Sequence, residues 1–70
     1  MTAGAIKVNG AAEALSAASL EELLAGRGVT AATRGVAVAV NGSVVKRADW
    51  PATRLAAGDE IEIIKAISGG

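Results

Sequence analysis

Very few residues of this 70-residue sequence carry the side chains that catalysis usually needs. There is no His and no Cys, which excludes an imidazole base, a thiolate nucleophile and a thiolate metal site. Carboxylates are present, but they are scattered over a helix start, a turn and strand positions without metal-ligand spacing: Glu13, Glu21, Glu22, Asp49, Asp59, Glu60 and Glu62. We therefore expect that the chain is not an enzyme.

The remaining group that could do chemistry is the terminal carboxylate of Gly70, which follows Gly69. A carboxylate is a poor electrophile and reacts only after activation, for instance as an acyl-adenylate. Glycine suits this role because it lacks Cβ, so it can thread a narrow channel and adopt backbone angles closed to other residues. When extended, the segment from Ile67 to Gly70 spans roughly 14 Å, enough to enter a partner's active site. The alternative is an accidental Gly-Gly end.

Composition limits the other functions that the chain could have. Seventy residues form one domain with a small aliphatic core, since the sequence has seven Val, five Leu and five Ile but a single Trp and no Phe or Tyr. The net charge is zero, which argues against nucleic acid as a partner. No signal peptide or membrane span is evident, so we expect a soluble cytoplasmic protein without a membrane partner.

Two hairpins are predicted, one at each Asn-Gly pair, because this dipeptide between alternating residues is the strongest short hairpin signal. The turns fall at Asn9-Gly10 and Asn41-Gly42. The predicted strands cover residues 5–8 and 11–15 in the first hairpin, and residues 36–40 and 44–45 in the second.

A short helix is predicted between the hairpins. Ser19 and Glu22 form a capping box, in which the hydroxyl accepts from the backbone near Glu22 and the carboxylate accepts from the amide of Ser19. The helix should dock on a sheet through a stripe of leucines and end at a left-handed glycine, Gly26 or Gly28. The stripe consists of Leu20, Leu23 and Leu24.

The second hairpin alternates valines with alanines. Val36, Val38 and Val40 should face the helix, which places Ala37 and Ala39 on the opposite side of the sheet. Small apolar residues there would form a flat, weakly polar surface. That surface suits a docking partner or is an ordinary solvent face.

The second hairpin leads into an irregular crossing and then a last strand. Trp50, in the crossing, should close one end of the core. From Glu60 the residues alternate again, which predicts a strand with Ile61 and Ile63 on one face and Ile64 on the other.

The order hairpin, helix, hairpin, crossing and final strand defines the predicted fold. A strand reached by a long crossover can pair parallel to the first strand at the sheet centre, whereas hairpin neighbours are antiparallel. The expected fold is α+β, the β-grasp or ubiquitin-like arrangement, with a mixed four- to five-stranded sheet and one main helix on one face. Residues 1–67 should form this domain and residues 68–70 a flexible C-terminal tail.

Three motifs follow one another in the second half of the chain: R-x-x-W, L-x-x-G-D-x-I-x-I and a terminal Gly-Gly. Together they resemble the C-terminal half of the thiamine-biosynthesis sulfur carrier family. The sequence departs from that family at Lys46, where proline is common, and at Ser68, where a third glycine is frequent. The matching residues are Arg47, Trp50, Leu55, Gly58, Asp59, Ile61, Ile63, Gly69 and Gly70.

The resemblance implies a protein substrate that carries sulfur between enzymes. A ubiquitin-activating-type adenylyltransferase would use ATP and magnesium to adenylate Gly70, and the chain itself would bind no cofactor. A sulfur donor such as a cysteine desulfurase would supply a persulfide, leaving a thiocarboxylate that thiazole synthase consumes. By the same resemblance, Gly69 gives access to the partner's tunnel, and Ile67 and Ser68 set the exit of the tail.

Related functions stay open at this point. The chain could be the small subunit of molybdopterin synthase or another thiocarboxylate carrier, although the stretch before the tail lacks the proline pair usual in the molybdopterin proteins. A ubiquitin-like modifier would instead form an amide between Gly70 and a target lysine. A β-grasp adaptor with an inert tail would function without Gly69-Gly70.

Overall fold

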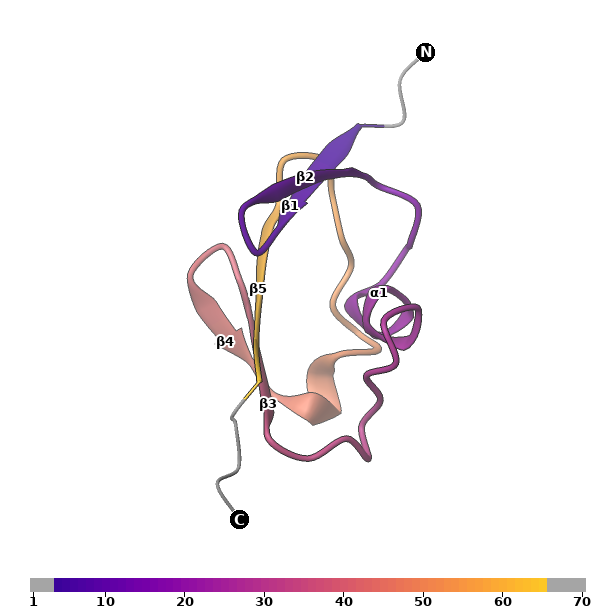
Figure 1. Ribbon diagram of the computed structural model, residues 1–70. Coiled ribbons are helices and arrows are strands. Elements are labelled where there is room, and N and C mark those ends of the chain that lie inside the picture. Colours follow the sequence, from indigo (N-terminus) through magenta and orange to yellow (C-terminus); the bar gives the residue numbers. More distant parts are fainter. Residues whose placement is uncertain (1–3, 66–70) are drawn as a thin grey trace.

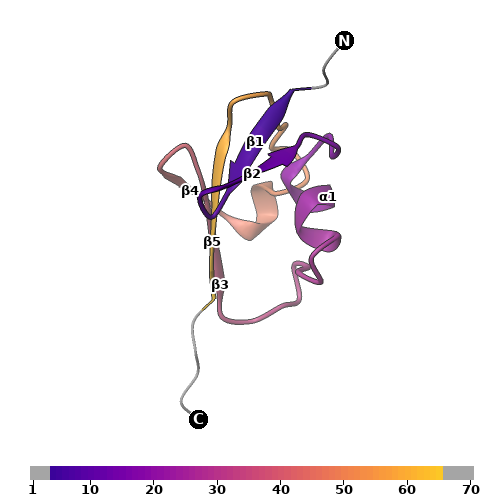
Figure 2. The same cartoon turned by 45° about the horizontal axis from the view of Figure 1, so that its top comes forward.

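The computed structural model of the protein describes residues 4–65. Five strands form one mixed sheet in the order β2-β1-β5-β3-β4, and helix α1 lies across one face of it (Figures 1 and 2). This architecture confirms the predicted α+β, β-grasp fold. The elements are β1 (Ala5–Val8), β2 (Ala11–Ala14), α1 (Leu20–Ala25), β3 (Val36–Val40), β4 (Ser43–Val45), the 3-10 helix η1 (Arg47–Asp49) and β5 (Glu60–Lys65).

Both predicted hairpins are present and turn at the Asn-Gly pairs. Asn9 and Asn41 each have a φ of 52°, and the glycines that follow have φ values of 84° and 85°. Positive φ at both central residues is the type I′ turn, whose twist matches that of the flanking strands. The turns fix the antiparallel registers β1–β2 and β3–β4.

Helix α1 begins and ends close to where the sequence predicts, with one correction. The amide of Glu22 donates to Ser19 Oγ (3.2 Å), as a capping box requires. The Glu22 carboxylate, however, accepts from the amide of Ala18 (3.1 Å) and not from that of Ser19. The backbone around Ser19 forms an isolated antiparallel bridge with Arg54, which sets the geometry of this helix entry.

Gly28 is the left-handed residue that ends the helix, with a φ of 79°. Gly26 keeps a helical conformation. Past Gly28, the amide of Val29 donates to the carbonyl of Leu24 (2.9 Å), the long-range bond of a Schellman motif.

The core lies between α1 and the sheet and is built mainly from aliphatic side chains. Leu23, predicted to be part of the helix stripe, is only partly buried. Trp50 is 2% exposed, which confirms that it closes the core, and its Nε1 donates to the carbonyl of Val45 (3.1 Å). The buried residues of this core cluster are Ile6, Val8, Leu20, Leu24, Val29, Val38, Trp50 and Ile61.

The crossing from β4 through η1 carries the chain across to the start of β5. There β5 inserts between the two hairpins, parallel to β1 and antiparallel to β3. As predicted, Ile61 is buried and Ile64 lies on the other face of the strand, 58% exposed.

Candidate functional site

The predicted site residues lie outside the described residues: Gly70, which should carry the chemistry, and the tail residues Ile67, Ser68 and Gly69. So does the predicted domain boundary between residues 67 and 68. The described part of the site is therefore strand β5, the element that leads to them. It occupies the centre of the sheet and ends at Lys65 (Figure 1).

The start of β5 is fixed by the Gly58-Asp59 turn. The Asp59 carboxylate accepts from the amide of Ala56 (2.8 Å) and from the side-chain amide of Asn41 (3.0 Å). Asn41 also accepts from the amide of Glu60 through its Oδ1 (2.9 Å). Hydrogen bonds thus join the Gly58-Asp59 turn to the Asn41-Gly42 turn. These bonds fix the position of the start of β5.

Asn9 holds the middle of β5 from the opposite side. Its backbone amide donates to the carbonyl of Ile61 (2.9 Å), and its Oδ1 accepts from the amide of Ile63 (2.8 Å). The side chain therefore replaces a backbone carbonyl at the point where β1 turns away. The sequence predicted Asn9 and Asn41 only as turn formers. The sequence signal for this second role is that Asn, and not glycine, occupies the first turn position in both hairpins. Asn has a side-chain carbonyl that can accept a hydrogen bond.

The R-x-x-W motif also has a structural role. Arg47 donates to the carbonyls of Ala31 (2.9 Å) and Val36 (3.3 Å), and its guanidinium lies 5.4 Å from the centroid of the Trp50 ring. These contacts join the loop before β3 to the end of the core.

The predicted alanine surface is only partly present. Ala37 is exposed, but Ala39 is 7% exposed, so the prediction is wrong at that position. Ala39 lies between Val44 of β4 and Glu62 of β5, and these longer cross-strand neighbours cover its short side chain. The large apolar side chains exposed on this face are those of Val44 (75%) and Ile64 (58%).

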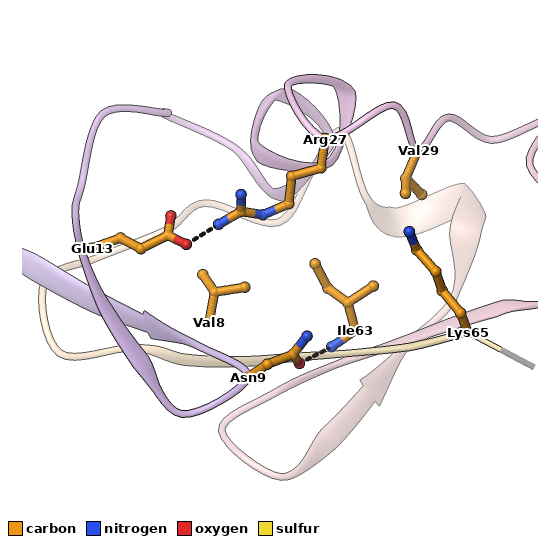
Figure 3. Close-up of a pocket in the computed structure, with 7 residues that line it drawn as sticks. All are labelled: Val8, Asn9, Glu13, Arg27, Val29, Ile63 and Lys65. Atoms are coloured by element: carbon orange, nitrogen blue, oxygen red, sulfur yellow. Dashed lines mark hydrogen bonds and ion pairs between the residues drawn. The ribbon is translucent and has the colours of Figure 1, made fainter.

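On the helix side, an open groove of about 510 Å³ runs beside the second half of β5 (Figure 3). Arg27 and Glu13 form an ion pair over it, and Lys65 rises from β5 toward Val29. The groove therefore has an apolar floor and a basic residue next to the point where the described chain ends. Its lining residues are Val8, Asn9, Glu13, Arg27, Val29, Ile63 and Lys65.

The described residues contain no group of three or more acidic side chains placed to hold a metal ion. No helix within residues 4–65 is long and apolar enough to span a membrane. Among the described carboxylates, those of Glu22 and Asp59 accept hydrogen bonds from backbone amides and that of Glu13 forms an ion pair.

A β-grasp domain with this strand order and one helix across the sheet is a ubiquitin-like protein by its fold. The chain belongs to the ThiS family, whose model matches residues 3–70. A comparison with curated protein sequences gives no match.

Two solved structures of a Geobacter metallireducens protein resemble this chain over most of its length. The crystal structure of thiamine biosynthesis protein (ThiS) has 35% sequence identity and a TM-score of 0.72, covering 94% of this chain and 99% of the other. The solution structure of a thiamine biosynthesis protein has 30% identity and a TM-score of 0.72, covering 94% of this chain and 87% of the other.

Proposed function

We propose that the chain is the sulfur carrier of thiazole formation in thiamine biosynthesis, and that Gly70 carries the sulfur as a C-terminal thiocarboxylate. The observation that carries the proposal is the family match, which runs through residue 70 and so includes Gly69-Gly70. Both similar structures are of a thiamine biosynthesis protein, which supports the same pathway. In this role the chain is a protein substrate and its partners are the enzymes.

The proposed chemistry begins with activation of Gly70 by a ubiquitin-activating-type adenylyltransferase. A carboxylate oxygen attacks the α-phosphorus of ATP, pyrophosphate leaves with magnesium, and an acyl-adenylate forms. A persulfide derived from a cysteine desulfurase then attacks the acyl carbon and AMP leaves. The attack forms a C–S bond, so an acyl disulfide results. A second thiol then cleaves the S–S bond that came from the persulfide: it forms a disulfide with the former persulfide cysteine and releases the thiocarboxylate for thiazole synthase. These steps require ATP and take place in the cytoplasm.

The chain's own contribution is to present the acyl carbon in reach of these enzymes. β5 is bonded into the sheet centre, so the sheet fixes the strand from which the chain continues toward Gly70. Ile67 and Ser68 set the exit direction, and Gly69 passes the partner's tunnel because it has no Cβ. In this proposal ATP and magnesium are bound by the partner and not by the chain.

The activation step is tested by ATP–pyrophosphate exchange with the adenylyltransferase purified from the same organism. The full-length chain should stimulate exchange, and a variant lacking Gly70 should not, although both should unfold at the same denaturant concentration. Equal stimulation by the two proteins would contradict the proposal.

The fate of the activated chain separates the carrier from the alternatives. With a cysteine desulfurase, cysteine and thiazole synthase added, the proposal expects sulfur to pass from the chain to the thiazole product. A ladder of covalent protein adducts would instead identify a modifier. Sulfur transfer only to a molybdopterin precursor would identify the related carrier.

A further inference from the structure

We propose that the free edge of β5 between Ile63 and Lys65 pairs with an extended segment of the adenylyltransferase, and that this segment places an acidic side chain against Lys65. The inference rests on the proposed function, because it concerns the enzyme that takes the tail. It adds a second contact to that complex, made by the backbone of the strand itself.

The direction of the backbone groups along β5 defines this edge. The carbonyls of Asp59 and Ile61 accept from β1 and from Asn9, and the amide of Ile63 donates to Asn9 Oδ1. The carbonyl of Glu60, in contrast, accepts from Asn41 at the end of β3. Because groups alternate along a strand, the carbonyl of Ile63 and the amide of Lys65 point to the side of β1.

No strand lies beside these two groups within residues 4–65. The β1–β5 register stops at the pair Val8↔Ile61, because the chain turns away at Asn9-Gly10. On its other side, β5 stays paired with β3 as far as the pair Val36↔Lys65. Although β5 is the middle strand of the sheet, its second half thus has a free edge on the β1 side. A free edge is a template for an added strand.

The groove beside this edge defines the chemistry of the added segment. Val8, Val29 and Ile63 provide an apolar floor for a side chain that enters from the new strand (Figure 3). At its rim Arg27 is paired with Glu13, whereas Lys65 has no ion-pair partner within residues 4–65. A segment with one apolar side chain and a carboxylate two residues away matches both features, since alternate residues of a strand share a face.

The position of the edge identifies the partner as the enzyme that binds the tail. Lys65 is the last described residue, and Gly70 follows five residues later. An enzyme that holds Gly70 in its active site therefore lies next to Lys65, since five extended residues span at most roughly 18 Å. A second copy of this chain would not bring its own active site to the tail.

Amide hydrogen exchange, measured by NMR on the full-length chain with and without the purified adenylyltransferase, tests the pairing directly. The amide of Ile64 points toward β3 and should exchange slowly in both samples. The amide of Lys65 should exchange fast in the free chain and about tenfold or more slowly in the complex. Unchanged exchange of the Lys65 amide in a complex that forms would overturn the proposal. Protection of this amide in the free chain that increases with the concentration of the chain would also overturn it, because it indicates pairing between two copies.

Charge reversal tests the acidic contact. Lys65→Glu should weaken binding to the enzyme by about tenfold, with a loss that shrinks in high salt, because it places like charges together. The matched control Lys46→Glu changes an exposed lysine near η1 and should leave binding unchanged. Equal effects of the two variants would overturn the acidic contact.

Failure of this inference is distinguishable from failure of the proposed function. The full-length chain could stimulate pyrophosphate exchange while the Lys65 amide is not protected in the complex and Lys65→Glu does not weaken binding. In that case only the edge pairing is wrong. If the chain neither binds the enzyme nor stimulates exchange, the proposed function itself is wrong.

Discussion

The two halves of β5 are held in different ways. The first half, at Glu60 and Ile61, has strands on both sides and is fixed further by the side chains of Asn41 and Asp59. The second half, which ends at Lys65, is paired on the β3 side alone within the described residues. The fold therefore anchors the half of β5 that is farther from Gly70 in sequence, and it leaves the half nearer in sequence without a strand on the β1 side within residues 4–65.

The largest effect should come from truncating apolar side chains in the two halves. Ile61→Ala should destabilise the domain by about 2–5 kcal/mol, because Ile61 is 1% exposed and its loss leaves a cavity in the core. Ile64→Ala should change the free energy of unfolding by about 0.5 kcal/mol or less, since this side chain is already largely in water.

Urea denaturation of both variants measures this difference. If Ile61→Ala does not fold, Ile61→Val and Ile64→Val provide the same comparison with smaller cavities. Equal destabilisation at the two positions would show that the second half of β5 is as firmly packed as the first.

A smaller effect should follow from removing the anchor at the start of β5. Asp59→Ala deletes the acceptor of two hydrogen bonds and should cost about 2 kcal/mol. The matched control is Asp49→Ala, which removes an exposed carboxylate from η1 and should cost much less. A denaturation midpoint for Asp59→Ala equal to that of the control would contradict an anchoring role for Asp59.

The smallest effect should come from the point where the two halves meet. Asn9→Gly keeps a residue that tolerates positive φ but removes the acceptor for the amide of Ile63, at a cost of about 1 kcal/mol. Hydrogen exchange should show faster exchange at Ile63 and little change at Ile64, which bonds toward β3. A uniform increase along the whole strand would mean that Asn9 stabilises the domain globally and does not hold β5 locally.

Local signals in the sequence predicted most of the fold. The Asn-Gly turns, the Ser19 cap and the strands β3 and β5 were each predicted from neighbours close in the chain, and each is present in the structure. The fold class followed from the order of these elements. The family resemblance found from the motifs was confirmed by the family match.

The parts that sequence could not predict depend on register between distant strands. The contact of Asn9 with Ile63 joins residues 54 positions apart, so no local pattern signals it. Ala39 is buried because of which residues lie opposite it on β4 and β5. The groove beside Lys65 depends on where β1 ends relative to β5, which is again a matter of register.

The intact mass of the chain after reaction tests the central claim most directly. The full-length protein is incubated with the adenylyltransferase, ATP, magnesium, a cysteine desulfurase, cysteine and a thiol reductant. We predict a mass gain of one sulfur-for-oxygen exchange, located at Gly70 by fragmentation and absent from the variant lacking Gly70. An unchanged mass under conditions where the enzyme is active, or the same gain in the variant without Gly70, would contradict the claim that Gly70 carries the sulfur.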